Sequence, residues 1–507
     1  MTDHVTSAAR SAPRGSIILA LLLLGFSGCE ERPERNAGGS GADAPLTDLD
    51  RRAELDSAAS QGASESGPPA PLDTSTPDAS KDGALKPPPG KVGIAPCIAG
   101  YGTEGKAGRG GSVIKVTNLN TSGSGSLQAC IDATGSRTCV FEVGGLIDYS
   151  TSVKIKNPYI TIAGQTAPEP GITILGGPLS IQTSEVFVQH IRIFPGDGAG
   201  NAGYVRDGVS IAGKVGSERR NIVLDHLTVA FTVDENMEVY YQGDRVSGVT
   251  LSNNMHVYPL NCSIHDEGCH GFGPLVSGDP RDQSDQEYIS FVRNLFALGV
   301  GRHPRINDTR AEVINNFVYG ARQRGLEAEL QKGHDPGWIN IINNVFRASP
   351  DHVSYYSNCY IISTPVHAKG NDGDAKKLVG RDACEDRGPA TPYSPMSNYS
   401  NSIIPTAKVS AFVLAHAGAR PKKRYVVEKT AAAHAKNGTG KVIDKPTDLG
   451  ADVWDSYKVK STRPVSSIGL PSDPNGDANK DGYTNLENWL HDLDCQVGGN
   501  CAGQCGP

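Results

Sequence analysis

Residues 289–347 contain one short segment three times, and this repeat decides the fold. The copies read ISFVRNLFA (289–297), AEVINNFVY (311–319) and INIINNVFR (339–347). Each copy is a short apolar run with asparagine near its centre. Related segments lie upstream: VFVQHIRIF (186–194), NIVLDHLTV (221–229) and VTLSNNMHV (249–257). When the six segments are aligned, their central polar residues are His190, His226, Asn254, Asn294, Asn316 and Asn344.

The six positions are 36, 28, 40, 22 and 28 residues apart, while the strand text stays constant. Such a pattern is typical of a solenoid, in which one unit repeats and the loops differ in length. Because the unit is a strand, the sequence predicts an all-β fold, a right-handed parallel β-helix. We expect the four asparagines to form a hydrogen-bonded ladder without a chemical role. A β-sandwich would need steadier spacing and more hairpin turns.

The composition agrees with a turn-rich architecture. Of 507 residues, 60 are Gly, 33 are Pro and 11 are Cys, and only 20% are charged. This composition favours turns over long helices. The formal net charge of -7 comes from 55 acidic and 48 basic residues without a basic stripe, so we expect no nucleic-acid partner.

The N-terminal segment predicts export. Residues 16–26 read SIILALLLLGF, an apolar run too short to span a bilayer, so residues 1–28 are interpreted as a signal peptide. The small residues before Cys29 resemble a bacterial lipoprotein signal, in which this cysteine is lipidated. The alternative is a plain secretory signal with an incidental cysteine. We expect secretion across the inner membrane and lipid anchoring at the outer membrane or cell surface, with membrane contact only through the lipid.

Composition also predicts the domain boundaries. Residues 30–92 contain nine prolines and no Phe, Tyr, Trp or Ile, so residues 29–92 are interpreted as a disordered tether. The β-helix is expected over residues 93–400, and a C-terminal cap over residues 401–507. Lipidation of Cys29 would leave ten cysteines, enough for five disulfides. We expect a monomer.

Three ordered stretches carry a family resemblance. GYGTEGKAGRGGSVIKVTNLNTSGSGSLQACI (100–131), VFEVGGLID (140–148) and ITIAGQTAPEPGITI (160–174) resemble the pectate lyase superfamily of polysaccharide lyases, and the match extends over about residues 98–350. The resemblance implies three parallel sheets, a substrate groove on one flank, bound calcium and β-elimination of polygalacturonate. We therefore expect a calcium-dependent enzyme acting on a uronate-containing polysaccharide.

The resemblance also implies site residues. Elimination needs a base for the proton α to a uronate carboxylate and a cation that stabilises the developing charge. Asp207, Asp234 and Glu238 match the calcium ligands, Arg302 matches the catalytic base, and Arg305 matches an arginine that holds substrate. Taken without the resemblance, Asp234, Glu235 and Glu238 could be a solvated acidic turn, and the two arginines a surface pair.

The sequence departs from the family in the predicted groove. No Lys occurs between Lys214 and Lys332, and Asn261 stands near the place of a groove lysine. His270 is the preferred substitute as a substrate contact, ahead of His265, and a Cys262–Cys269 disulfide is expected to close their loop. Asn307 replaces a further arginine. These changes leave room for an altered uronate substrate or weak catalysis.

Two other polar groups receive different roles. His190 and the Asp225-His226 pair are assigned to core hydrogen bonding at inward strand positions, not to catalysis. Residues 420–444 have basic and helical character and are expected to cap or cover the end of the β-helix.

The C-terminal segment DPNGDANKDGYTNLENWLHDL (473–493) resembles an EF-hand-like calcium loop. Its predicted ligands are Asp477, Asn479, Asp481, Tyr483 and Glu487, although position twelve of the loop is Asn488. The alternative is an Asp/Asn-rich turn. Cys495, Cys501 and Cys505 are expected to form a disulfide knot.

Two rival functions remain open. A β-helical glycoside hydrolase would use a pair of carboxylates and release saturated ends. A non-catalytic glycan-binding surface lipoprotein would keep the scaffold without turnover, and the missing groove lysine favours it.

Overall fold

The computed structural model describes residues 92–198, 203, 206–212, 217–242, 245–279, 287–330, 337–354, 356–374, 384–455 and 467–499. The predicted signal peptide, Cys29 and all but the last residue of the predicted tether lie outside these ranges. Within them, the structure contains no helix with the length and apolar character needed to cross a membrane.

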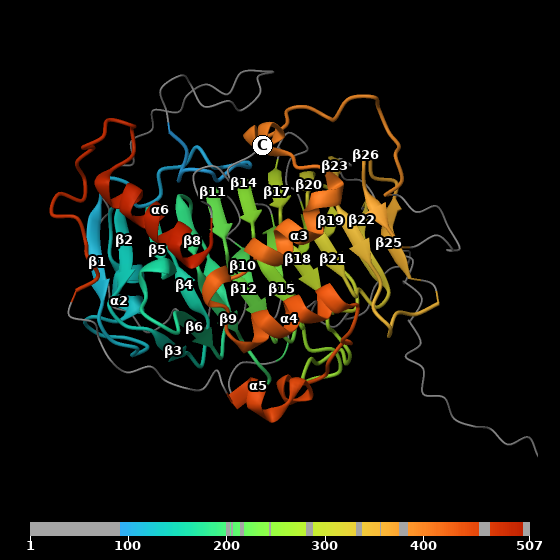
Figure 1. The fold of residues 1–507 in the computed structure, drawn as a ribbon, viewed down its shortest axis with the longest axis horizontal. Coiled ribbons are helices and arrows are strands. Elements are labelled where there is room, and N and C mark those ends of the chain that lie inside the picture. The colour runs from blue at the N-terminus through green and yellow to red at the C-terminus, as the bar shows by residue number, and fades with distance from the viewer. Residues whose placement is uncertain are drawn as a thin grey trace, which may run out of the picture. The chain divides into compact units, whose positions relative to one another are not determined.

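Three sheets of parallel strands form the body of the protein (Figure 1). Sheet A comprises β1 (Ser112–Val116), β2 (Arg137–Phe141), β5 (Ile160–Ala163), β8 (Val186–Gln189), β11 (Glu218–Asp225), β14 (Arg245–Ser252), β17 (Tyr288–Val292), β20 (Arg310–Ile314), β23 (Trp338–Ile342) and β26 (Val366–Lys369). Sheet B comprises β3 (Gly145–Asp148), β6 (Ile172–Leu175), β9 (Ile191–Phe194), β12 (Thr228–Ala230), β15 (Met255–Val257), β18 (Leu295–Ala297), β21 (Phe317–Tyr319), β24 (Val345–Arg347) and β27 (Asp372–Gly373). Sheet C comprises β4 (Val153–Ile155), β7 (Leu179–Ile181), β10 (Val209–Ala212), β13 (Met237–Gln242), β16 (Leu275–Asp279), β19 (Arg305–Asn307), β22 (Arg324–Glu329) and β25 (Ser357–Ile362).

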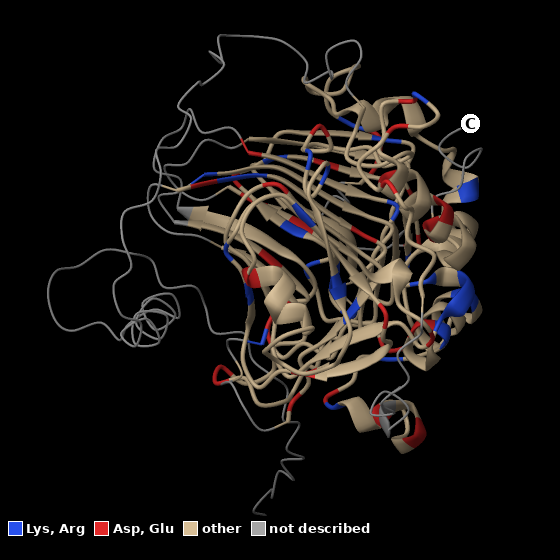
Figure 2. Cartoon of the chain, turned by 90° about the vertical axis from the view of Figure 1, so that its left-hand side faces the viewer, with Lys and Arg blue, Asp and Glu red and all other residues tan. Residues whose placement is uncertain are grey.

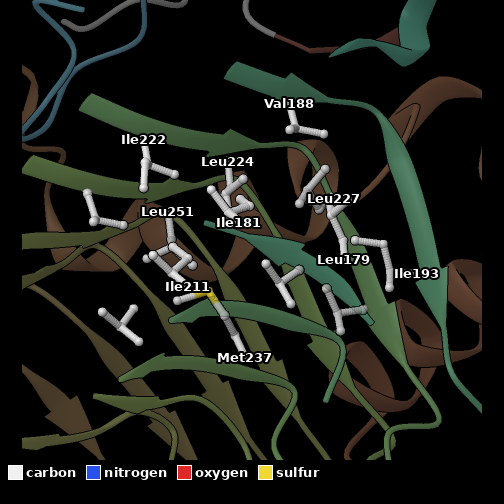
Figure 3. Close-up of a cluster of buried hydrophobic side chains, with 14 of the residues drawn as sticks. Leu179, Ile181, Val188, Ile193, Ile211, Ile222, Leu224, Leu227, Met237 and Leu251 are labelled. Atoms are coloured by element: carbon white, nitrogen blue, oxygen red, sulfur yellow. The ribbon is translucent and has the colours of Figure 1, made fainter. Parts of the chain in front are cut away.

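From β2 onward, successive strands enter sheets A, B and C in turn, so that each full coil adds one strand to each sheet. The predicted right-handed parallel β-helix is therefore confirmed. Inward side chains from all three sheets meet in the interior, where Ile181, Ile193 and Leu224 are almost completely buried (Figure 3). Burying each such aliphatic side chain stabilises the fold by roughly 1.5–3 kcal/mol.

The predicted asparagine ladder is confirmed at the bend between sheets A and B. The side-chain amide of Asn294 donates to Oδ1 of Asn316 at 3.0 Å, and that of Asn316 donates to Asn344 at 3.0 Å. The backbone N–H of Asn254 joins the same row by donating to Asn294 Oδ1 at 2.9 Å, and Asn371 extends the row beyond Asn344. Each side chain thus satisfies polar groups that the bend would otherwise leave buried and unpaired.

The two histidines do not belong to this row, which corrects the alignment by one residue. Asp225 pairs in register with both Gln189 and Ser252, so His190 and His226 lie beside Asn253. All three residues have left-handed backbone conformations, with φ of 55, 52 and 53° respectively. They therefore occupy the bend itself and not the inward strand positions that the sequence predicted. The alignment slipped because a polar residue occurs at both adjacent positions of the bend.

Helices cover the coil at one end and along one side. Helix α2 (Leu127–Asp132) contributes buried side chains to the first coils, and a Cys130–Cys139 disulfide joins it to β2. The other helical elements are η1 (Gly164–Thr166), η3 (Asn398–Ser402), α3 (Thr406–His416), η4 (Pro421–Lys423), α4 (Val426–Asn437), η5 (Pro446–Leu449), α5 (Ala451–Asp455) and α6 (Asn485–Val497). Figure 2 looks at the side carrying the first coils and shows acidic and basic segments on both coils and helices.

The segment expected to cap the end of the β-helix instead covers its side. Val413 of α3 and Ala431 of α4 pack in one cluster with Val257 and Leu295 of sheet B. Helix α6 lies further along, where Leu486 and Leu490 pack against Ala163 of sheet A. The correction follows from the outward apolar residues of sheet B, which require cover along the whole stack.

Three further findings concern the cysteines. The predicted Cys262–Cys269 disulfide is present, and a Cys359–Cys384 disulfide joins two later segments. Cys97 and Cys495 are also disulfide-bonded, whereas Cys501 and Cys505 lie outside the described residues. This cysteine usage is typical of proteins that fold in an oxidising compartment.

Candidate functional site

Buried carboxylates gather where strands β10 and β13 of sheet C begin. Asp207 lies two residues before β10 begins at Val209, while Asp234 and Glu235 lie in the turn before β13. The backbone holds these turns together, because Gly208 N–H donates to Glu235 O at 3.1 Å. Carboxylate oxygens of the three residues lie within 4.8 Å of one another.

Burial excludes the alternative of a solvated acidic turn. Asp207 is 2% exposed, Asp234 is 2% exposed and Glu235 is 4% exposed. Three carboxylates at such short distances repel one another unless a positive charge lies nearby. Oxygen ligands of this kind fit a hard cation such as Ca²⁺.

Glu235 completes this group, and the predicted ligand Glu238 stands further along β13. There Glu238 accepts a hydrogen bond from Ser210 Oγ at 3.3 Å, opposite which it lies in the sheet register. It is also buried, at 5% exposure. Sequence reasoning placed Glu235 in the acidic turn but gave it no role, because spacing does not reveal which carboxylates of a tight turn face inward.

Arg302 lies against these carboxylates. Its guanidinium forms an ion pair with Glu235 and stacks 4.1 Å from the centre of the Phe272 ring. Its backbone is left-handed, with φ of 60°, and its N–H donates to Glu327 Oε1 at 2.7 Å. Although burial favours the neutral carboxyl, the Arg302 charge and hydrogen bonds hold the pKa of Glu235 well below its usual range. The structure thus brings the predicted base and two predicted metal ligands together.

His270 and His265 cover the same carboxylates from the disulfide-closed loop. The two rings stack at 4.0 Å, and His270 Nε2 lies 3.3 Å from Asp234 Oδ1. His265 Nε2 lies 3.7 Å from the same oxygen, and its Nδ1 accepts the Glu267 N–H at 3.1 Å. His270 is 13% exposed at its side chain, so it borders the buried group and can still meet a ligand.

Arg305 lies on β19, two strands beyond β13, on the outward face of sheet C. It pairs in register with Leu275 on one side and Glu327 on the other. Its guanidinium donates to Glu329 Oε2 at 2.8 Å, and its side chain is 26% exposed. Arg305 is therefore reachable by a substrate, but it already holds a carboxylate partner.

The two asparagines at the family departures make local contacts. The Asn307 side chain on β19 donates to Ser277 Oγ at 3.3 Å, and the backbone carbonyl of Asn261 accepts the His270 N–H at 2.8 Å. Asn261 also donates to Cys262 Sγ at 3.2 Å. These neutral side chains therefore support the loop and sheet without adding positive charge.

The C-terminal loop is folded around its own acids. Asp477 accepts the N–H groups of Asp481 and Gly482, at 3.2 and 3.1 Å. The Asn488 side chain reaches Asp481 Oδ1 at 3.3 Å, so position twelve does face the loop. Glu487 instead caps α6 through Thr484 and forms a 2.7 Å ion pair with Arg109.

Tyr483 also connects the C-terminal loop to Arg109, near the N-terminal side of the body. The Arg109 guanidinium lies 5.4 Å from the centre of the Tyr483 ring. Asp481 Oδ1 accepts the Tyr483 N–H at 2.9 Å. The contacts of Tyr483 and Glu487 with Arg109 therefore hold the first turn of α6 in place without a bound ion.

A second group of polar residues, the α6 cluster, lies where α6 covers the coil. It comprises Asp494 of α6 and, beneath it, His190, His226 and Asp225. His190 Nε2 lies 2.6 Å from Asp494 Oδ1, and His226 Nδ1 lies 2.6 Å from Asp225 Oδ2. The Arg420 N–H donates to His190 Nδ1, which leaves the ring proton on Nε2, facing Asp494. That tautomer leaves no lone pair on Nε2 for a metal. The predicted role in hydrogen bonding, not catalysis, agrees with these contacts.

The fold and the sheet C site define a class of protein. It is a parallel β-helix in which a buried group of carboxylates lies beside an arginine, where inner strands of one sheet begin. Comparison with known proteins then gives particular relatives. The chain is 27% identical over 428 residues to a probable pectate lyase C of Aspergillus flavus, an alignment that covers 78% of this chain and 93% of that protein. It is 34% identical over 257 residues to a probable pectate lyase C of Neosartorya fischeri, covering 50% of this chain and 54% of that one.

The chain also has similarity to solved structures, at lower identity. Jun a 1, the major allergen from cedar pollen, matches with a TM-score of 0.47 and 16% identity, covering 63% of this chain and 92% of that chain. No protein-family model matches the chain. The predicted resemblance to pectate lyases is confirmed by the relatives.

Proposed function

We propose that the protein is a calcium-dependent polysaccharide lyase that cleaves a uronate-containing chain, such as polygalacturonate, by β-elimination. The observation that carries the proposal is the buried group of Asp207, Asp234 and Glu235 lying against Arg302. The fungal relatives described as probable pectate lyases support the same reaction class.

In this proposal the carboxylates Asp207, Asp234 and Glu235 hold Ca²⁺, and Glu238 stands further along β13, where it accepts from Ser210. When bound, Ca²⁺ supplies positive charge that stabilises the negative charge developing on the substrate uronate. Arg302, in its neutral form, takes the proton α to that carboxylate; the bond from the β carbon to the glycosidic oxygen then breaks as the carbon–carbon double bond forms, and the leaving oxygen takes a proton from water. Phe272 and the Arg302 N–H bond to Glu327 fix the position of the guanidinium.

Arg305 and His270 are proposed as substrate contacts beside this centre. Both side chains are partly exposed, and His270 borders the buried carboxylate of Asp234. Arg305 can present two parallel N–H donors to a carboxylate, which is the geometry that a uronate prefers. His270 contributes an imidazole ring in place of the groove lysine that the resemblance implied near Asn261.

We also propose where the protein is located and where a second cation binds. Cys29 is proposed as the lipid anchor, with the body held outside the cytoplasm as a monomer. A second Ca²⁺ is proposed in the C-terminal loop, held by Asp477, Asn479 and Asp481 with Asn488 at position twelve, where it would stabilise the start of α6. The amide of Asn488 can present its oxygen to an ion by rotating about its last bond.

The experiment is a spectrophotometric one. Purified protein is mixed with polygalacturonate, with added CaCl₂ or with a chelator, and ultraviolet absorbance of the unsaturated product is followed. We expect absorbance to rise with calcium and to stop when the chelator is added. Reducing ends formed without any absorbance would instead indicate a glycoside hydrolase.

A non-catalytic glycan-binding protein is the second candidate. The ion pair between Arg302 and Glu235 favours it, because a carboxylate partner stabilises the charged guanidinium and opposes a base role. Retention of the protein on immobilised polygalacturonate without any product would support this candidate.

A further inference from the structure

Two exposed apolar side chains lie together on strand β25, at the end of sheet C. Tyr360 is 40% exposed and Ile362 is 39% exposed, and both point outward because Cys359 and Ile361 face the interior. Successive outward residues of one strand stand side by side. The pair therefore forms a small aromatic and aliphatic surface on the same sheet that carries Arg305.

The register connects this surface to the proposed centre. Arg305 on β19 pairs with Glu327 on β22, and Glu327 pairs with Tyr360 on β25. Neighbouring strands are roughly 4.8 Å apart, so Tyr360 stands about 10 Å from the Arg305 position along one row. A sugar chain that crosses the sheet at Arg305 and continues past β22 reaches Tyr360.

The charged groups between these residues are already paired. Arg324 lies 4.2 Å from the centre of the Tyr360 ring, and its guanidinium lies 3.5 Å from Glu327 Oε2. Arg305 is paired with Glu329, which lies in register with Ile362. A uronate carboxylate at this place would meet two carboxylates and compete with them for two guanidinium groups. An uncharged sugar ring would avoid that competition.

We propose that Tyr360, backed by Arg324 and flanked by Ile362, forms a stacking subsite for an uncharged sugar unit of the polysaccharide, such as a methyl-esterified uronate. The inference rests on the proposed function for the chain that passes the site, and it adds a preference for partly esterified polymer. Stacking of a ring on an aromatic face contributes modest binding free energy and little charge dependence.

The experiment compares Tyr360→Ala, Tyr360→Phe and the control Tyr159→Ala. Tyr159 is similarly exposed, at 43%, but lies at the start of a sheet A strand. Initial rates are measured on fully de-esterified and on partly methyl-esterified polygalacturonate. We expect KM for the esterified polymer to rise roughly three- to tenfold in Tyr360→Ala, with kcat unchanged, and KM for the de-esterified polymer to change less. Tyr360→Phe keeps the ring and is expected to behave like the wild type.

Equal KM values for Tyr360→Ala and Tyr159→Ala would overturn the subsite, as would an equal loss on both polymers. If the wild type releases no unsaturated product, the proposed function fails, and the subsite is then tested by electrophoresis through gels containing each polymer. Retardation by the esterified polymer that Tyr360→Ala abolishes and Tyr159→Ala retains would support the subsite. Identical migration of the two variants would overturn it.

Discussion

The protein contains two clusters of carboxylates and histidines with similar composition and opposite surroundings. At sheet C, before strand β13, Asp234 lies against the stacked rings of His265 and His270. The side chains of His270 and Arg302 are partly exposed. Beneath α6, Asp494 lies against stacked His190 and His226, which are completely buried. Access to solvent separates the two clusters more clearly than composition does.

Hydrogen bonding separates them as well. In the α6 cluster each histidine has a carboxylate partner at 2.6 Å, and Asp225 accepts further bonds from Ser252 and Asn253. In the sheet C cluster the corresponding histidine-to-carboxylate distances are 3.3 and 3.7 Å. The first arrangement closes a network, whereas the second leaves room for a ligand. The comparison predicts that substitutions at sheet C reduce activity and substitutions under α6 reduce stability.

The largest expected effect is on catalysis by Arg302→Ala. A residue that transfers a proton in the transition state contributes about 10²- to 10⁴-fold to the rate, so kcat of the folded protein should fall by that factor. The measurement is product absorbance on polygalacturonate at saturating calcium. Arg347→Ala is the matched control, since Arg347 is also ion-paired and partly exposed but lies on sheet B. Full turnover in Arg302→Ala would show that another residue is the base.

The next effect is on stability, by Asp494→Ala. Removing one partner of a buried charged hydrogen bond leaves the other unsatisfied, which costs roughly 3–5 kcal/mol. We expect a lower melting temperature by calorimetry and unchanged kcat at 25 °C for the protein that remains folded. Asp492→Ala changes an exposed carboxylate of the same helix and should leave both quantities unchanged. A loss of kcat in Asp494→Ala without loss of stability would remove the distinction between the clusters.

A smaller effect is expected on cation affinity, by Asp234→Asn. Replacing a charged oxygen ligand by a neutral one weakens calcium binding, so the calcium concentration that gives half-maximal activity should rise by about tenfold or more. The titration is repeated with Asp374→Asn, an exposed carboxylate beside Arg347 on the far side of the coil. Identical calcium curves for both variants would place the activating cation elsewhere.

The sequence predicted what repeats and missed what depends on distant partners. Four asparagines recur at one position of a strand, and the ladder follows from their repetition. Arg302 and Asp207 lie in motifs that the family resemblance locates. Asp494, by contrast, lies 304 residues from His190, and no local pattern joins them. Long-range packing of this kind is set by the cover that sheets A and B require.

Single-residue errors arose where adjacent residues share one chemistry. Glu235, Asp234 and Glu238 are all acidic, and only the backbone of the turn decides that Glu235 meets Arg302. The same applies to His226 and Asn253, which share a bend position that the alignment placed one residue away. Spacing identifies the segment that carries a site, whereas the direction of each side chain depends on φ and ψ at single residues.

The smallest effect concerns His256, a further buried histidine, which has no carboxylate partner among the described residues. Its ring stacks on Phe296 at 5.2 Å, and neither ring nitrogen has a hydrogen-bond partner within the described part of the chain. Burial, with a smaller contribution from His303, lowers the pKa of His256 to about 3. Because the unfolded chain binds a proton near pH 6.5 and the folded protein does not, stability is lost as pH falls from about 6.5 towards 3. At pH 5.5 the loss is about 1 kcal/mol, and His256→Phe should remove it, giving a smaller difference between melting temperatures at pH 7.5 and pH 5.5 than the wild type shows. An unchanged difference between the two melting temperatures would mean that His256 does not contribute to the loss of stability at low pH.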